Sequence, residues 1–116
     1  MGGGTELKKV VLLYCGIGGI MVVFSFREFG ENLGTRLLGR KVREQLAPLL
    51  EQDEFVVLDF TGVNVVSNSF ADECIAKLLL TMSLAELKAH TTFRGLNSVA
   101  AECVLTALQR RHLAMA

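Results

Sequence analysis

The stretch formed by residues 55–82 constrains the fold most, because its hydrophobic pattern changes once from that of a strand to that of a helix. Residues 55–58 are apolar without alternation, as in a strand that is covered on both faces of a parallel sheet. Beyond this strand, apolar side chains recur at helical spacing, at Phe70, Cys74, Ile75, Leu78 and Met82. A strand, a polar turn and a helix therefore follow one another, and we expect any functional site to lie at that turn.

Polar residues at both ends of this turn have predicted structural roles. Ser69 precedes the helical stripe and is predicted to be its N-cap, with the Asp72 carboxylate three residues later in the position of a capping box. Asp59 ends the strand, where its carboxylate can accept hydrogen bonds from amides near Thr61. Asp72 and its neighbour Glu73 lie off the apolar stripe, so we expect both outside the buried face of the helix.

The rest of the chain supplies the other elements of an α/β domain. We expect strands over residues 8–14 and 20–26, joined by a turn at the glycine cluster 16–19, then a loop over 30–34 and a helix over 35–47. After the central stretch we expect a connection over 83–89 that can include a further helical turn, a short edge strand at 91–93, and a final helix from Asn97 or Ser98. Pro48 is predicted to end or kink the first helix, because proline lacks an N–H group. This order predicts a mostly parallel sheet of about four to five strands with an antiparallel N-terminal hairpin, and about three to four helices.

Composition limits the classes of protein to which this chain can belong. Its 116 residues suit a single domain over residues 1–116, of which we expect 1–6 to be disordered. Twelve basic and twelve acidic residues give a net charge of zero, so no global field attracts nucleic acid or anionic lipid. Three widely spaced cysteines fit neither a zinc site nor a disulfide framework, and they indicate a reducing, cytoplasmic compartment.

The uncharged run over residues 10–26 is the one segment that challenges a soluble, cytoplasmic protein. This run falls short of the roughly 20 apolar residues that a spanning helix needs. β-branched and aromatic residues flank the glycines at 16–19, which favours a hairpin over a membrane anchor or a signal peptide. A phosphate-binding loop is rejected, because a strand pattern follows the glycines and Met21 stands where the dinucleotide fingerprint requires glycine.

No catalytic residue, metal site or cofactor is predicted, and we do not expect an enzyme. His90 and His112 fall at a strand start and in the last helix, so neither has an evident nucleophile beside it. Cys74 and Cys103 lie on apolar helix stripes and are interpreted as small core residues.

Three arginines form a row on one face of the first helix. Arg36, Arg40 and Arg43 stand at positions i, i+4 and i+7, opposite the apolar stripe. Such a row could hold a phosphate backbone, but no aromatic residues interleave it and the net charge is zero. We interpret the row as a solvated helix face.

Residues 58–79, LDFTGVNVVSNSFADECIAKLL, resemble the central motif of STAS domains, the fold of bacterial anti-sigma-factor antagonists, and are closer still to a group of small bacterial STAS-like domains. The matching residues are Asp59, Phe60, Gly62, Val63, Ser69, Phe70, Ala71, Asp72 and Glu73. The resemblance implies a STAS-like fold and a non-enzymatic regulatory role. It also implies a switch operated by a serine kinase of the histidine-kinase-like ATPase superfamily.

The resemblance assigns the phosphoacceptor role to one residue. In the antagonists the acceptor turn reads Asp-Ser-Ser or Asp-Ser-Thr, followed by glycine. In this chain Ser67 stands at the aspartate position and Phe70 replaces the glycine, so Ser69 alone carries the acceptor role over by position. Ser69 can therefore be a helix cap or a phosphoacceptor, and the sequence leaves both roles open.

These observations predict a protein-interaction domain that docks its partner through the strand-to-helix turn. The resemblance implies a partner that is a histidine-kinase-like ATPase or an anti-sigma-type regulator. The predicted binding residues are Asp59, Ser67, Asn68, Ser69, Phe70, Asp72 and Glu73. The alternative is a small-ligand or nucleotide sensor that uses the same turn.

Overall fold

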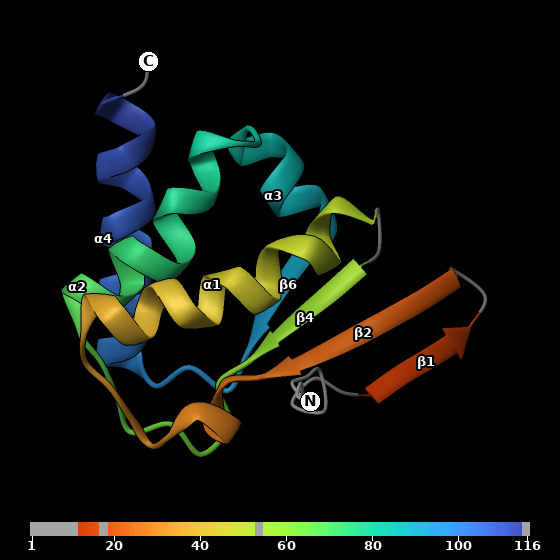
Figure 1. The fold of residues 1–116 in the computed structure, drawn as a ribbon, viewed down its shortest axis with the longest axis horizontal. Coiled ribbons are helices and arrows are strands. Elements are labelled where there is room, and N and C mark those ends of the chain that lie inside the picture. The colour runs from red at the N-terminus through yellow and green to blue at the C-terminus, as the bar shows by residue number, and fades with distance from the viewer. Residues whose placement is uncertain (1–11, 17–18, 53–54, 115–116) are drawn as a thin grey trace, which may run out of the picture.

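The computed structural model describes residues 12–16, 19–52 and 55–114 of the chain. Its strands are β1 (Leu12–Gly16), β2 (Gly19–Ser25), β3 (Asn32–Leu33), β4 (Phe55–Asp59), β5 (Val65–Val66) and β6 (Thr91–Arg94). Its α-helices are α1 (Arg36–Glu51), α2 (Asn68–Phe70), α3 (Leu84–His90) and α4 (Ser98–Ala114). Tighter and wider helical segments are the 3₁₀ helix η2 (Phe26–Phe29), the π-helix η3 (Ala71–Ile75) and the 3₁₀ helix η4 (Ala76–Leu80). Together they form an α/β fold with a mostly parallel sheet, as the sequence predicts (Figure 1).

The main sheet has the strand order β1-β2-β4-β6. β4 lies inside the sheet and runs parallel to β2 on one side and to β6 on the other, which makes β6 the edge strand that the sequence predicts. Val56, Val57 and Leu58 of β4 are all buried, which explains the unbroken apolar run in the sequence. The carboxyl ends of β2, β4 and β6 meet at one edge of the sheet, where Asp59 ends β4.

β1 pairs with β2 in the antiparallel direction. Leu12 lies opposite Val23 at one end of this pair, and Gly16 lies opposite Gly19 at the other, so both glycines belong to strands. The turn predicted over residues 16–19 is therefore wrong for its two end residues, and residues 17–18 lie outside the described residues, as do residues 1–11 with the predicted disordered start.

Where the structure describes it, the uncharged run over residues 10–26 forms strands except at its last residue. β1 and β2 both lie entirely within this run, and Phe26 begins η2. Within residues 12–16, 19–52 and 55–114, no helix combines the length and the apolar character that crossing a bilayer requires.

A second sheet, which the sequence pattern did not predict, pairs β3 with β5. Asn32 lies opposite Val65 and Leu33 lies opposite Val66, in the parallel direction. The sequence predicts a loop here because a two-residue strand is too short to show any alternation. The pairing brings the chain just before α1 and the chain just before α2 side by side, which positions the strand-to-helix turn.

α1 begins where the sequence predicts, because Thr35 Oγ1 accepts a hydrogen bond from Leu38 N at 3.1 Å and caps the helix. The helix then runs through Pro48 to Glu51, so of the two predicted effects of Pro48, an end or a kink, the end is wrong. Its buried residues recur at helical spacing, at Gly39, Val42, Leu46 and Leu50. Because Leu50 lies beyond the proline, the helix gains core contacts by continuing past it.

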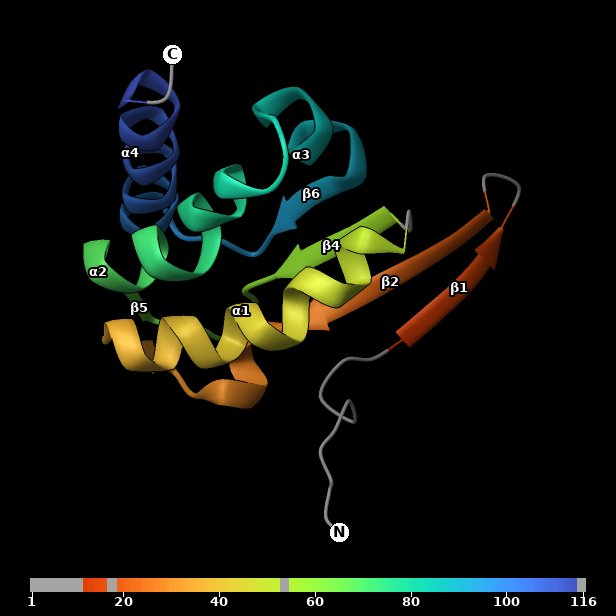
Figure 2. The ribbon, with the colours of Figure 1, turned by 45° about the horizontal axis from the view of Figure 1, so that its top comes forward.

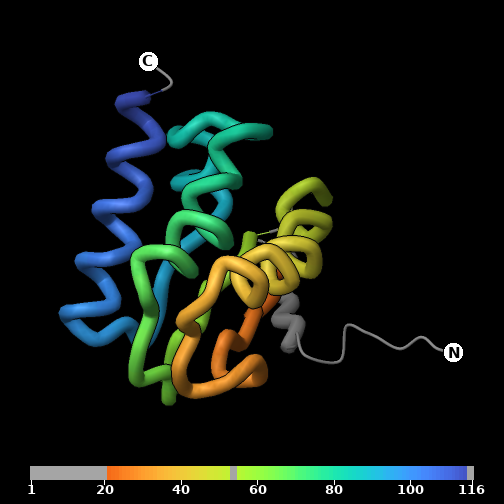
Figure 3. The backbone as a smooth tube through the Cα atoms, turned by 60° about the vertical axis from the view of Figure 1, so that its left-hand side comes forward, coloured from red at the N-terminus to blue at the C-terminus, as the bar shows by residue number. Residues whose placement is uncertain are grey.

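Residues 68–80 form one helical segment of changing pitch that lies between α1 and α4 (Figure 3). Three residues of α2 lead into the π-helix η3, and η4 completes the segment. Its buried side chains include four from the predicted stripe, Phe70, Cys74, Ile75 and Leu78. The predicted helix is therefore present, but it begins before Ser69 and is irregular along its length.

The last two helices are capped by polar side chains. Ser83 Oγ accepts a hydrogen bond from Glu86 N at 3.0 Å and Glu86 Oε1 accepts one from Ser83 N at 2.9 Å, which makes α3 a capped helix where the sequence predicts a connection. Asn97 Oδ1 accepts a hydrogen bond from Ala100 N at 2.8 Å, so α4 begins at Ser98 as predicted. Figure 2 shows α4 rising beside the segment over residues 68–80, away from β1 and β2.

Gly39 allows α1 and η3 to pack closely. A Cβ atom on this residue would lie 3.0 Å from Glu73 Cβ and 3.2 Å from the Phe70 carbonyl oxygen. Glycine inside a helix costs about 1 kcal/mol relative to alanine. Its place in the buried stripe of α1 is therefore explained by the short distance between the two helices rather than by helix stability.

We predict that Gly39→Leu lowers the free energy of unfolding by about 1–3 kcal/mol, the usual cost of overpacking a core. Leucine forms helices better than glycine, so a loss can come only from crowding against Glu73 and Phe70. Urea denaturation followed by circular dichroism measures the change. The control is Arg40→Leu at the exposed next position, which should change the free energy by less than about 0.5 kcal/mol. Equal stability of Gly39→Leu and the wild type would contradict the close packing.

Candidate functional site

Asp59 ends β4 and holds the turn that follows it. Its Oδ1 accepts hydrogen bonds from Thr61 N at 3.0 Å and Thr61 Oγ1 at 2.6 Å, and its Oδ2 accepts one from Arg94 NH2 at 2.9 Å. Burial raises the pKa of this carboxyl, but the hydrogen bonds from Arg94 and Thr61 outweigh burial, so the pKa is lowered. The predicted bond to a turn amide is confirmed, and it gives Asp59 a structural role.

Ser67, and not Ser69, caps the helical segment. Ser67 Oγ accepts a hydrogen bond from Phe70 N at 3.0 Å and donates one to the Gly34 carbonyl oxygen at 2.9 Å. Ser67 N donates to the Leu33 carbonyl oxygen at 3.0 Å. The predicted cap at Ser69 is therefore wrong, because the pairing of β3 with β5 directs the chain into the helix two residues earlier.

The residues after the cap present polar side chains at the surface. Asn68 is exposed, and Ser69 is half-buried as the second residue of α2. The Ser69 hydroxyl has no hydrogen-bond partner in the part of the chain that the structure describes. Phe70 differs from both, because its ring lies fully buried 6.4 Å from the ring of Phe26 and faces the core rather than a partner. Asn68 is thus the exposed residue of the predicted binding turn, and Ser69 is the half-buried one whose hydroxyl bonds to none of the described residues.

Asp72 holds α4 and α1 to η3. Arg111 of α4 binds its carboxylate with two hydrogen bonds, from Nε to Oδ1 and from NH2 to Oδ2, each 2.8 Å long. Arg36 NH1 of α1 donates to Oδ2 at 2.9 Å. The hydrogen bond from Arg111 lowers the pKa of Asp72 well below its usual range, and the hydrogen bond from Arg36 lowers it further. Burial raises the pKa, but its effect is smaller than that of Arg111. Asp72 therefore does not form the predicted capping box with Ser69.

Only 6 % of the surface of Glu73 is exposed, so the prediction that this residue lies outside the buried face of the helix is wrong. Its carboxylate is bound by Arg36 NH1 at 3.3 Å, Arg43 NH1 at 3.0 Å and Lys77 Nζ at 3.0 Å, and Arg43 also donates to the Glu73 carbonyl oxygen. Burial raises the pKa of Glu73, but hydrogen bonds from Lys77, Arg43 and Arg36 outweigh it and lower the pKa overall. Glu73 is thus an ionised carboxylate enclosed by cations.

The residues around Asp72 and Glu73 form one charged cluster, which consists of Arg36, Arg43, Asp72, Glu73, Lys77 and Arg111. Four positive charges face two negative ones, and the Arg36 side chain remains 55 % exposed. The interpretation of the arginine row as a solvated face is wrong for Arg43, which binds Glu73 with 22 % of its side chain exposed. Arg36 and Arg40 do lie at the surface, where Arg36 pairs with Asp72 and Glu73, and Arg40 pairs with Glu44. The signal for the cluster in the sequence was Gly39, which lies between Arg36 and Arg43 and lets η3 approach them.

The cysteine and histidine side chains that the structure describes, Cys74, Cys103, His90 and His112, form no visible reactive group. Cys74 is fully buried, and this burial raises the pKa of its thiol, so the thiol stays protonated. Cys103 is half-buried and packs against the core. His112 is exposed on α4, while His90 ends α3 at the opposite end of α1 from the turn. Among the described residues, no three His, Cys, Asp or Glu side chains are grouped to hold a metal ion.

The fold and the turn define a class of domain. A central parallel strand ends at a carboxylate, and a short turn then leads into a capped, irregular helix that packs between two others. Residues 39–100 match the model of the family described as STAS-like domain of unknown function (DUF4325). This chain belongs to that family, which confirms the resemblance seen in residues 58–79. No curated protein matches the chain, and no solved structure does so either.

We predict that Ser67→Ala lowers the free energy of unfolding by about 1–2 kcal/mol, because it removes the cap and the bond to Gly34. Ser69→Ala should lower it by less than about 0.5 kcal/mol, because its hydroxyl bonds to none of the described residues. Urea denaturation of the two variants gives the comparison. A larger loss of stability for Ser69→Ala than for Ser67→Ala would show that Ser69 is the cap.

We predict that Asp72 stabilises the fold less as the pH falls below about 4, the ordinary pKa of an aspartate in the unfolded chain. Because the pKa of Asp72 is lowered in the folded state, its contribution is complete above the unfolded value and is lost as the pH falls through the folded value. Asp72→Asn should therefore be less stable than wild type at pH 7, and the gap should narrow toward pH 2. Urea denaturation at several pH values measures the gap, in which the titration of Asp59 cancels, because Asp59 shares no partner with Asp72. A gap that stays constant would show that ionised Asp72 adds no stability.

Proposed function

We propose that the domain is a non-enzymatic regulatory module that docks a protein partner through Asn68 and Ser69 and the surface around them. The observation that carries this proposal is that two polar residues at the surface, Asn68 and Ser69, begin a helical segment that contacts on both sides hold in place. Ser67 fixes the turn to the chain before α1, and the charged cluster fixes η3 to α1 and α4. A surface held in this way binds with little loss of conformational entropy.

Exposed apolar side chains on the elements around the turn support a protein partner. Val65 of β5 is 49 % exposed, Val99 in the first turn of α4 is 71 % exposed, and Leu37 in the first turn of α1 is 62 % exposed. The two valines follow Asn64 and Asn97, which are joined by a 3.0 Å hydrogen bond from Asn97 Nδ2 to the Asn64 carbonyl oxygen. Protein-binding surfaces combine a central apolar part with polar groups around it, and these exposed side chains would supply the apolar part.

The charge of the cluster favours an acidic surface on the partner. Arg36 is bound to Asp72 and Glu73 through NH1 alone, and the rest of its guanidinium, half exposed, is held in position to donate to a carboxylate. The family resemblance adds that the partner is a histidine-kinase-like ATPase or an anti-sigma-type regulator. In this proposal docking weakens as salt rises, because charged contacts at a surface are screened.

Ser69 is the proposed regulatory residue. With the cap assigned to Ser67, the half-exposed Ser69 hydroxyl is free to accept a phosphoryl group without loss of the helix start. A phosphoserine adds about two negative charges to the docking surface and would repel an acidic partner. The alternative function, a sensor of nucleotides or other small anions at the same turn, draws on the same excess of positive charge.

The experiment is recovery of the partner from the source cell with four forms of the full chain: wild type, Ser69→Ala, Ser69→Asp and Gln52→Glu. Gln52 is exposed at the carboxyl end of α1, opposite to the end that lies beside the turn, so Gln52→Glu adds the same charge as a control. We expect wild type, Ser69→Ala and Gln52→Glu to recover the same partner, identified by mass spectrometry, and Ser69→Asp to lose it at an unchanged melting temperature. Intact mass of the protein from that cell tests for phosphate.

Two results would contradict the proposal. Equal recovery of the partner by wild type and Ser69→Asp would show that the turn is not part of the docking surface. A rise in melting temperature with ATP or GTP that Arg36→Gln abolishes, without any recovered partner, would favour the sensor instead.

A further inference from the structure

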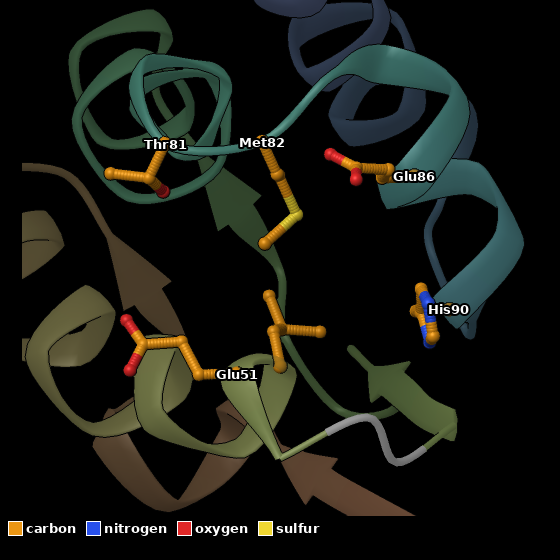
Figure 4. A pocket seen from close by; sticks show the side chains of 6 residues that line it. Glu51, Thr81, Met82, Glu86 and His90 are labelled. Carbon is orange, nitrogen blue, oxygen red and sulfur yellow. The ribbon is translucent and has the colours of Figure 1, made fainter.

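One face of the main sheet carries the helices α1, α3 and α4. The chain passes from β2 through α1 to β4, and from β4 through residues 60–90 to β6, so it moves across the strands twice in the same direction. Crossovers between parallel strands are right-handed, which puts the helices of both crossovers on the same face. In Figure 4, Glu51 of α1 and Glu86 of α3 line one pocket, of about 200 Å³, as neighbours on one face do. α4 packs on η3 and η4 of the second crossover. We call the opposite side of the sheet the outer face.

The outer face is apolar over two of its strands. Successive side chains of a strand point to opposite faces, and the core under the helices contains Val22, Phe24, Val56 and Leu58. The residues between them therefore lie on the outer face, where the register places Met21 beside Phe55, Val23 beside Val57, and Ser25 beside Asp59. Two of these three pairs are apolar in both strands. A face in contact with water is usually polar instead.

Val23 and Val57 are buried, although none of the described helices lies on their side of the sheet. Their exposed fractions are 8 % and 5 %, and neither belongs to the core under the helices. Thr92 of β6 lies beside Val57 in register and is exposed. Parallel strands that are apolar on both sides are typical of sheets with both faces covered. The burial of the two valines thus indicates a second cover, which lies over β2 and β4 and ends before β6.

This cover belongs to the same chain, because both valines are buried in a single copy. Outside the described ranges lie residues 1–11 and the pairs 17–18, 53–54 and 115–116. A pair of residues spans about 7 Å, which is less than the roughly 10 Å across two neighbouring strands. Eleven residues can span about 36 Å. They precede Leu12, which lies opposite Val23, so the segment starts one strand away from the buried pair.

We propose that residues 1–11 dock on the outer face and cover Val23 and Val57. The outer face is then an interaction surface whose occupant is the start of this chain. Leu7, Val10 and Val11 are the apolar residues of the segment nearest to β1, and their contact with the two valines removes apolar surface from water. The inference does not depend on partner docking at the turn, which lies at another surface.

The test places a thiol under the proposed cover and measures how fast it reacts. Val57→Cys is treated with iodoacetamide in the otherwise unchanged full chain, and mass spectrometry of peptides follows each cysteine separately. We expect the introduced thiol to react at least about tenfold more slowly than that of Thr92→Cys, because burial protects a group from reagents in solution. Leu7→Asp combined with Val10→Asp should bring the two rates within about twofold, because a charge is not buried against apolar surface without a partner.

Gly2→Asp combined with Thr5→Asp is the matched control, because it adds the same charge to the same segment without removing an apolar residue. It should leave the thiol of Val57→Cys protected. Cys74 reports on the fold, because it is fully buried under the helices and stays unreactive while the domain is folded. If Val57→Cys makes Cys74 reactive, Val23→Cys takes its place in the test.

Three results would overturn the proposal. The first is rapid reaction of the introduced thiol in the chain with an unchanged N-terminal segment. The second is protection that Leu7→Asp with Val10→Asp does not remove. The third is protection that is lost on dilution of the protein, which would assign the cover to a second copy of the chain.

Discussion

The buried carboxylate of Glu73 is the group on which the arrangement of the helices depends. An unpaired carboxylate in a protein interior costs several kcal/mol, and this one is ionised with 6 % of its surface exposed. The cations that bind it come from two elements, Arg36 and Arg43 from α1 and Lys77 from η4. If α1 moved away from the segment over residues 68–80, Glu73 would lose two of these three cations. Gly39 removes the side chain that would otherwise keep the carboxylate away. The position of the turn follows from this contact.

The parts of the fold that the sequence predicts are those with a repeated pattern. Four consecutive apolar residues at the start of β4, a helical stripe in α1 and another in α4 each give several independent signals for one element. The parts that it does not predict depend on single contacts. β3 and β5 are two residues long and exist only because they pair with each other, and α1 continues past Pro48 because Leu50 finds a place in the core. Contacts between residues that are distant in the sequence determine these elements, and a local sequence pattern does not contain those contacts.

The candidate site shows the same division. The sequence predicts where the turn lies, and Asp59 bonds to Thr61 as expected. It predicts the cap at Ser69, although Ser67 and Asn68 are also residue types that accept a hydrogen bond from a helix amide. Only the bond from Ser67 to Gly34, 33 positions away, selects the first of them. Asp72 and Glu73 likewise look solvated until the arginines of α1, which are distant in the sequence, are placed against them.

The charges at the two ends of α1 are the reverse of what its own dipole favours. Acidic residues stabilise the start of a helix and basic residues its end, by about 0.3–1 kcal/mol each, yet α1 begins with Arg36, ends with Glu51, and has no acid in its first turn and no base in its last. Arg36 is explained by contacts outside the helix, because Asp72 and Glu73 bind its guanidinium. Glu51 forms no ion pair with any residue in the described ranges, but it is exposed, so solvent screens its repulsion by the carboxyl end of the helix. The tertiary contact with η3 thus outweighs the unfavourable dipole at the start of α1, whereas exposure alone makes the charge at its end tolerable.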